Sequence, residues 1–256
     1  MRFLIRNTLF FILTVIILLL NITCAEPKDD TEASAYLGKT LNITGEQVWM
    51  PNYNTGKVSQ MLLKFDGDRT VDVVVELIAG YDSDGYPEFY IKSVGSGKIE
   101  KGILSFNVDV MKDVDLLESD DFLLQCFNEW YYDKDDNDNI SIDTAGVKGN
   151  IITLIALYND SKTIPVEGII REGFSGTKKS LTGQYIYYIY VNKNCKITAK
   201  EVKKTEVDYT FNKFELLLNA GWNTICKSET YTTTGDSSYS MTVKNPAINW
   251  VIQKMK

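Results

Sequence analysis

The chain has 256 residues, a formal net charge of −7 and no histidine. The absence of histidine excludes Ser-His and Cys-His nucleophile pairs, imidazole zinc sites and histidine acid–base catalysis. The chain is acidic and has no basic stripe with interleaved aromatic residues, so nucleic acid is not expected as a partner. A hydrophobic fraction of 44% is sufficient for a sizeable buried core at this length.

The first segment is typical of an export signal. Leu9 to Leu20 is apolar except for Thr14, and it follows the basic residues Arg2 and Arg6. This run is shorter than the span of about 20 residues that a transmembrane helix needs. We therefore expect residues 1–23 to be an export signal. Because the signal carries two arginines and no acid, its removal changes the net charge to −9.

Two cleavage sites compete at the end of this signal. Cys24 resembles the lipidation site of bacterial lipoproteins, which have an aliphatic residue three places before the cysteine and a small residue directly before it. Asn21 and Thr23 occupy these two positions here. An ordinary signal peptidase would instead recognise Thr23 and Ala25 and release a secreted protein that begins at Glu26. An uncleaved membrane anchor is the third alternative.

The signal is followed by a polar, acidic stretch and then by a long patterned body. Residues 24–35 include Pro27, Asp29, Asp30 and Glu32, a composition that suits a flexible, solvated tether. Residues 36–256 are predicted to form a β-rich domain. Since length constrains the number of domains only weakly, this domain is either one unit or two subdomains.

Most of the body has the pattern of β-strands. Residues 71–78 are rich in valine, and apolar residues alternate with polar ones over 104–110. Further strands are predicted at 89–94, 151–158, 166–171, 184–191, 207–218, 223–232, 239–243 and 248–252. Turns are predicted at 66–68, 82–85, 95–97 and 234–236. The predicted fold is mainly β, either an antiparallel barrel similar to lipocalins or a two-layer sandwich, with one short helix.

One segment has helical spacing instead. Leucine and aromatic residues recur on one helical face from Val114 to Tyr132, which predicts a helix over this range. A shorter helix beginning at Ser119 is the alternative, because serine is a good N-cap. Asp120 and Asp121 would then lie in the first turn, where they favour the helix dipole.

The loop after this helix carries half of a calcium-binding motif. Its candidate ligands are Asp133, Asp135, Asn137, Asn139 and Asp143. The first three occupy positions one, three and five of a twelve-residue EF-hand-like loop. However, Asp138 stands where the motif has glycine, and Thr144 stands where a bidentate glutamate closes the shell. The loop is therefore either a calcium site or a plain solvated turn.

Four tyrosines in one strand are the candidate ligand-binding residues. Tyr185 and Tyr187 alternate with Tyr188 and Tyr190, so the strand presents aromatic side chains on both faces. One interpretation places all four in the core of the sheet. The functional interpretation places one of the two pairs in a ligand cavity or on an aromatic binding face.

The three cysteines beyond Cys24 permit at most one disulfide among themselves. Cys195 and Cys226 lie in predicted strands, whereas Cys126 lies in the predicted helix. Three buried thiols that behave as small apolar residues are the alternative to a disulfide bridge.

Carboxylate chemistry is the one enzymatic route that the composition leaves open. A glycosidase needs two opposed carboxylates, and two acidic groups are candidates for that role. They are Asp82, Asp84 and Glu88, and Glu118, Asp120 and Asp121. No glycine-rich phosphate loop and no GxSxG nucleophile elbow occurs in the chain.

The signal ending in Cys24, the many short strands and the late turn at Gly221-Trp222-Asn223 together resemble uncharacterised bacterial surface or periplasmic lipoproteins. This resemblance implies a membrane anchor through lipid, on the outer surface or the periplasmic face of the envelope, or secretion if Cys24 is not lipidated. The predicted function is noncatalytic binding of a macromolecule or a small apolar ligand, with no cofactor unless the loop after the helix binds calcium. The alternatives are a carboxylate-dependent carbohydrate-active enzyme and a purely structural envelope component.

Overall fold

The computed structural model describes residues 35–51, 62–83, 87–127, 139–158, 165–177, 180–204 and 209–254. The chain divides into two compact units, Met1–Ala33 and Ser34–Lys256, and every described element belongs to the second. The apolar run from Leu9 to Leu20, Cys24 and the tether up to residue 34 lie outside the described residues. Within the described ranges, no helix is both long and apolar enough to cross a membrane.

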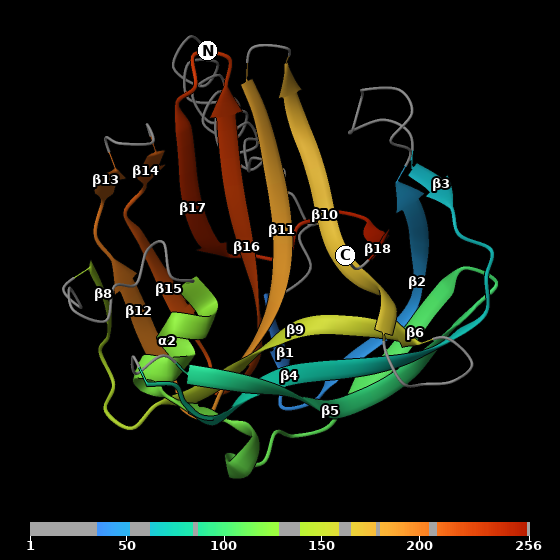
Figure 1. Ribbon diagram of the computed structural model, residues 1–256, viewed down its shortest axis with the longest axis horizontal. Coiled ribbons are helices and arrows are strands. Elements are labelled where there is room, and N and C mark those ends of the chain that lie inside the picture. The colour runs from blue at the N-terminus through green and yellow to red at the C-terminus, as the bar shows by residue number, and fades with distance from the viewer. Residues whose placement is uncertain are drawn as a thin grey trace, which may run out of the picture. The chain divides into compact units, whose positions relative to one another are not determined.

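The described part of the chain is mainly β, as predicted (Figure 1). Its strands are β1 (Tyr36–Gly38), β2 (Leu41–Pro51), β3 (Leu62–Lys64), β4 (Arg69–Tyr81), β5 (Pro87–Glu100), β6 (Ile103–Val108), β7 (Leu117–Glu118), β8 (Ile140–Ile142), β9 (Lys148–Tyr158), β10 (Pro165–Thr177), β11 (Ser180–Val191), β12 (Cys195–Ala199), β13 (Val202–Lys204), β14 (Tyr209–Phe211), β15 (Phe214–Leu218), β16 (Gly221–Thr232), β17 (Ser237–Val243) and β18 (Trp250–Lys254). The helical elements are the 3-10 turn η2 (Asp113–Asp115) and the helix α2 (Ser119–Phe127).

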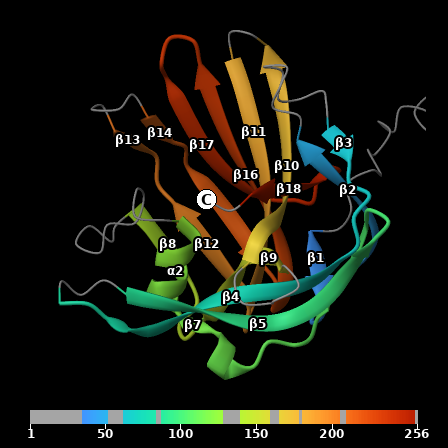
Figure 2. The same cartoon turned by 45° about the vertical axis from the view of Figure 1, so that its right-hand side comes forward.

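Fifteen of the described strands form one hydrogen-bonded sheet. Its order is β13-β14-β17-β16-β11-β10-β18-β2-β6-β5-β4-β9-β7, with β1 beside β16 and β3 beside β2. Figure 2 shows β17, β16, β11 and β10 side by side. The strands β15, β12 and β8 form a second sheet. The described pairings are antiparallel except for β18 with β2 and β14 with β17, which are parallel.

The strand β9 is the branch point of the large sheet. It pairs with β4 along one edge, and it also pairs with both β10 and β11. The pairings therefore run from β10 through β18, β2, β6, β5 and β4 and return to β10 by way of β9. This circuit brings strands from both ends of the chain around a shared core.

Large apolar side chains fill that core. Trp222, Phe122 and Leu41 are among the largest side chains that are almost completely buried. The helix α2 buries Phe122 against β9 at Gly149, where an added Cβ would lie 2.8 Å from the phenyl ring. Glycine at this position therefore lets the helix pack directly on the strand.

The helix begins later than the longer of the two predictions. It starts at Ser119, as the shorter alternative predicts, and not at Val114. The preceding residues are held elsewhere, because Asp115 lies in the turn η2 and Leu117 pairs with Gly149 of β9. The predicted end at Tyr132 lies outside the described residues.

Two further predictions were wrong. Residues 95–97 form no turn but continue the 14-residue strand β5. Gly95 and Gly97 serve close packing on β6 instead, since an added Cβ would lie 2.4 Å from the Asn107 oxygen and 2.2 Å from the Ser105 oxygen, respectively. The predicted strand over 207–218 is two strands, β14 and β15, which belong to different sheets.

The cysteines lie in the predicted kinds of element. Cys126 is in α2, Cys195 is in β12 and Cys226 is in β16. Cys126 and Cys195 are free thiols, so no bridge joins Cys195 to Cys226. Burial raises the pKa of the Cys195 thiol to about 11, with a smaller contribution from Asp143.

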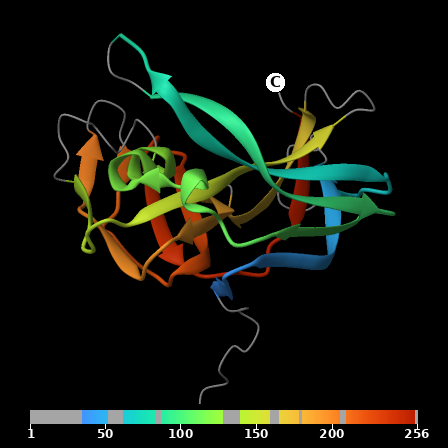
Figure 3. The ribbon, with the colours of Figure 1, turned by 90° about the horizontal axis from the view of Figure 1, so that it is seen from below.

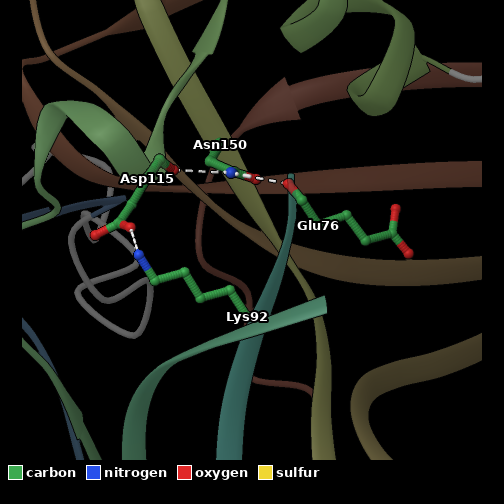
Figure 4. A network of polar contacts seen from close by, with 4 residues as sticks. All are labelled: Glu76, Lys92, Asp115 and Asn150. Carbon is green, nitrogen blue, oxygen red and sulfur yellow. Dashed lines mark hydrogen bonds and ion pairs between the residues drawn. The ribbon is translucent and has the colours of Figure 1, made fainter. Parts of the chain in front are cut away.

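A buried amide joins three segments beside the hairpin of β4 and β5 (Figure 4). The Nδ2 atom of Asn150 donates to the backbone oxygen of Glu76 at 3.1 Å and to the backbone oxygen of Asp115 at 2.9 Å. Its Oδ1 atom accepts a hydrogen bond from the Ile151 amide at 2.8 Å. The Asp115 carboxylate also forms an ion pair with Lys92 of β5. This network holds η2, β4 and β5 against β9.

Candidate functional site

The four tyrosines lie on β11, where two neighbouring strands diverge. Residues 180–186 of β11 pair with β10, whereas residues 189–191 pair with β9. Between these two ladders, Tyr187 and Tyr188 have no described strand partner on this edge. A cavity of about 60 Å³ lies at this fork, lined by isoleucines together with Arg171, three of the tyrosines and Trp250. Small-molecule pockets have volumes of roughly 300–1,000 Å³, so the fork cavity is too small for such a ligand.

Tyr188 and Tyr190 point into the core. Tyr188 stacks on Trp250 with ring centroids 5.8 Å apart and an interplanar angle of 8°. Tyr190 makes an edge contact with the buried Trp222 at 5.4 Å. Burial raises the pKa of Tyr188 to about 12, although the nearby Arg171 opposes this shift. These two tyrosines therefore have the packing role that the core interpretation predicts.

Arg171 fixes the C-terminal segment beside Tyr188. Its guanidinium donates to the Tyr188 hydroxyl at 3.0 Å, to Oδ1 of Asn245 at 2.6 Å and to the Pro246 oxygen at 2.8 Å. It also lies 5.5 Å from the centroid of the Trp250 ring. Because most of its donors are already used, we assign Arg171 to holding the segment before β18 and not to binding a ligand.

Tyr185 and Tyr187 lie on the opposite face of the sheet. Side chains alternate along a strand, so the register places every second residue of β10, β11, β16 and β17 together on this face. We call this surface the Tyr185 face. Its aromatic and charged members are Glu172, Phe174, Tyr185, Tyr187, Lys227, Glu229, Tyr231 and Tyr239, of which Glu172 and Tyr239 are buried. The same register adds Gly183, Leu181, Ile225 and Met241 to this face.

Aromatic rings and charged groups alternate across the Tyr185 face. The Lys227 ammonium lies 5.9 Å from the centroid of the Tyr185 ring and 5.2 Å from that of Tyr239. It also forms an ion pair with Glu229 at 2.7 Å. The Tyr231 hydroxyl donates to Oε2 of the same glutamate at 2.8 Å. The charged side chains are therefore already oriented by the rings around them.

A glycine allows two of these rings to lie close to the sheet. Phe174 meets Tyr185 edge to face at 6.2 Å. Both rings lie over Gly183, since an added Cβ there would be 3.1 Å from the Tyr185 hydroxyl and 3.2 Å from the Phe174 ring. A larger residue at position 183 would push the two rings away from the sheet.

Burial and nearby carboxylates act on the tyrosine hydroxyls of this face. Burial and the carboxylates of Glu229 and Glu172 raise the pKa of Tyr185 to about 12. Burial and Glu229 raise the pKa of Tyr187 to about 12 as well. Both hydroxyls are therefore neutral hydrogen-bonding groups near pH 7. Among the described residues, this face has the carboxylates of Glu172 and Glu229 and the ammonium of Lys227, a set that suits a neutral or cationic ligand better than an anion.

Comparison with protein-family models, curated proteins and solved structures found no match for this chain. The functional interpretation therefore depends on the chemistry of the Tyr185 face and of the fork cavity.

The calcium prediction falls only partly within the described residues. Asp133, Asp135 and Asn137 lie outside them. The Asn139 oxygen accepts the Lys200 amide at 2.9 Å. Oδ1 of Asp143 accepts the Lys196 amide at 2.8 Å, and this contact is the main cause that lowers the pKa of Asp143. Among the described residues, no cluster of acidic or sulfur ligands suits a metal ion.

At least two of the six acidic residues considered for catalysis have structural contacts. Glu118 forms an ion pair with Lys148 at 2.9 Å, and Asp121 accepts a hydrogen bond from the Tyr81 hydroxyl. Asp84 lies outside the described ranges, and Glu88 is exposed near the end of the β4–β5 hairpin. The sequence did not single out Glu172 and Glu229: Glu229 lies in the predicted strand 223–232, and Glu172 lies one residue beyond the predicted strand 166–171.

Proposed function

We propose that this chain is a noncatalytic lipoprotein of the bacterial envelope that binds a carbohydrate chain through the Tyr185 face. The observation that carries the proposal is the alternation of aromatic rings with Lys227, Glu229 and Glu172 on one sheet face. The export segment and Cys24 support its location at the outer surface or the periplasmic face of a membrane. If Cys24 is not lipidated, the protein is secreted.

Sugars have the mixed chemistry that this face complements. Their C–H surfaces pack on aromatic rings, while their hydroxyls need hydrogen-bond donors and acceptors in fixed positions. Tyr231, whose side chain is 46% exposed, supplies an accessible ring beside the Glu229 carboxylate. The excess of carboxylates favours neutral sugars over acidic ones. The small volume of the fork cavity likewise favours a macromolecule over a small apolar ligand.

A carbohydrate-active enzyme is the second candidate, because Glu172 and Glu229 lie near Tyr185 and both raise its pKa. A glycosidase would use two such carboxylates, one as acid and one as nucleophile or base. Product analysis separates the two functions, since a binding protein leaves the carbohydrate chain intact. A purely structural component would do neither.

We further infer that β9, β10, β18, β2, β6, β5 and β4 close into a small barrel. The support is the circuit of strand pairings that returns to β9. The parallel pairing of β2 with β18 differs from an up-and-down lipocalin arrangement, in which neighbouring strands are antiparallel.

Carbohydrate binding is testable with immobilised neutral and acidic oligosaccharides, with and without calcium. We expect neutral chains to be retained intact. The Tyr231→Ala and Glu229→Gln variants should each raise the dissociation constant about tenfold, the effect of losing one central contact. Tyr81→Ala is the matched control, because Tyr81 is an exposed tyrosine on β4, outside the Tyr185 face.

Three results would contradict this proposal. A preference for acidic oligosaccharides would contradict the argument that the carboxylates of this face favour neutral sugars. Equal losses of affinity in the Tyr231→Ala and Tyr81→Ala variants would contradict the location of the binding site on the Tyr185 face. Shortened oligosaccharides in the product would favour the enzyme instead. Binding that depends on calcium would support the predicted ion site without changing the location of the sugar site.

The anchor is tested by mass spectrometry of the mature N-terminus. We expect a chain that begins at Cys24 and carries two or three acyl groups. Cys24→Ser should abolish acylation and move the protein from the membrane fraction to the medium or periplasm. A mature chain that begins at an unmodified Glu26 would contradict the lipid anchor and leave the secreted form.

A further inference from the structure

The hairpin of β4 and β5 extends beyond the strands beside it (Figure 3). The described pairing of β4 with β9 ends at Val75, and that of β5 with β6 begins only at Gly95. Over residues 76–81 and 87–93, the two hairpin strands pair only with each other in the described part of the chain. An open strand edge of this kind is a template for pairing with another strand.

The two edges of this hairpin segment differ. On the β4 side, the side chains of Asn150 and Gln125 donate to the backbone oxygen of Glu76. The Tyr81 hydroxyl donates to Asp121 of α2. Groups of β9 and α2 therefore contact that side at Glu76 and Tyr81. On the β5 side, no described strand lies beside residues 87–93. The open edge therefore belongs to β5.

Exposed apolar side chains lie along this open edge. Phe89 is 38% exposed, Tyr90 is 48% exposed and Ile91 is 56% exposed. Phe89 and Ile91 project from one face of the hairpin and Tyr90 from the other, because side chains alternate along the strand. Three consecutive exposed apolar residues on an unpaired edge indicate a surface that a partner covers.

The sequence along this edge is complementary to itself. If two β5 edges pair in antiparallel fashion around Tyr90, Glu88 lies opposite Lys92 of the second copy and Phe89 lies opposite Ile91. Both opposite-charge pairs and apolar pairs stabilise antiparallel strands when they face each other directly. Lys92 is already held by Asp115, which positions its ammonium on the same face of the hairpin as Glu88.

We propose that the open edge of β5 pairs with the same edge of a second copy of this chain, with a two-fold axis at Tyr90. The pairing is isologous, so each copy contributes the same residues and the assembly closes as a dimer. It joins the two hairpins into one continuous sheet. This contact is separate from the Tyr185 face and does not depend on carbohydrate binding.

Cysteine cross-linking of the full-length chain in detergent tests both the contact and its register. Directly opposite residues lie about 4.5–5.5 Å apart, within the range of a disulfide. The Tyr90→Cys variant should therefore form a disulfide dimer under mild oxidation. Glu88→Cys alone should not, because four residue positions separate the two copies of residue 88 by about 13 Å. A mixture of the Glu88→Cys and Lys92→Cys variants should form a disulfide dimer, because these two positions lie opposite each other.

The unsubstituted chain measures the background from the native cysteines. Failure of Tyr90→Cys to cross-link above that background would overturn the proposal. Cross-linking of Glu88→Cys with itself as efficiently as Tyr90→Cys would overturn the register.

Sedimentation of the detergent-solubilised full-length chain supplies an independent readout. We expect Ile91→Lys to raise the dimer dissociation constant at least about tenfold, because it opposes an ammonium to Phe89 of the partner. Leu217→Lys is the matched control, since Leu217 is an aliphatic strand residue with 66% exposure on β15. The substituted side chains are exposed, so both variants should fold. A monomer at every concentration, or equal weakening by both variants, would overturn the proposal.

Discussion

Replacing Trp250 with alanine is expected to lower the free energy of unfolding by about 3–5 kcal/mol, the usual cost of removing a large buried ring. Trp250 is only 2% exposed. Its ring stacks on Tyr188, meets Phe106 edge to face at 5.8 Å and lies beneath the Arg171 guanidinium. Urea unfolding followed by circular dichroism would measure the change.

The effect is large because Trp250 begins β18, the short strand between β10 and β2. Its removal leaves a cavity beside the existing one at the fork of β9, β10 and β11, and it weakens the contact that closes the strand circuit. Trp250→Phe keeps part of the ring stack and should lose less. Leu217→Ala, at an exposed position, should stay within about 0.5 kcal/mol of the unsubstituted chain. A loss below about 1 kcal/mol for Trp250→Ala would contradict this account.

Local pattern was sufficient to predict most strands but not the way they are joined. The alternation over 104–108 and the valine run over 71–78 correspond to β6 and β4. The glycines at 95 and 97 led to a wrong prediction. Both a tight turn and a close approach of neighbouring strands favour a residue without a side chain. Only the position of β6 against β5 decides between them.

For the candidate site, too, the local pattern predicted which tyrosines share a face but not which face is buried. Period-two alternation separated Tyr185 and Tyr187 from Tyr188 and Tyr190, and the structure places these pairs on opposite faces. The sequence did not indicate which pair faces the core, since that depends on Trp250, about 60 residues later in the chain.

The charged partners of Tyr185 were missed for a related reason. Glu172 lies opposite Tyr185 on β10, and Lys227 lies opposite it on β16. Register between strands is set by packing and turn geometry, which a single sequence does not reveal. A search for acidic and basic residues at alternating positions of the predicted strands would have found Lys227 but not Glu172, which lies one residue beyond the predicted strand 166–171. Such a search would also not have joined the two side chains into one face.

Replacing Asn150 with leucine is expected to destabilise the fold by about 3–5 kcal/mol, because a buried polar group left without its partner costs roughly 1–3 kcal/mol. The substitution removes the donor to the Glu76 and Asp115 oxygens and the acceptor for the Ile151 amide. Asn150 is completely buried, so water does not readily replace the lost bonds. The exposed Asn107 on β6 is the matched control, and Asn107→Leu should change stability by less than about 0.5 kcal/mol.

The Asn150→Asp variant removes the Nδ2 donor but keeps the size and shape of the side chain, so it separates these two effects. The carboxyl keeps the size of the amide and still accepts the Ile151 hydrogen bond, but in its ionised form it faces two carbonyl oxygens. Burial and these oxygens raise its folded-state pKa above the unfolded value of about 3.9. Stability of this variant should therefore be highest below that value and fall as the pH rises through the folded-state pKa. Urea unfolding at several pH values would reveal this dependence. A variant as stable at pH 7 as at pH 4, relative to the unsubstituted chain, would contradict the assigned hydrogen bonds.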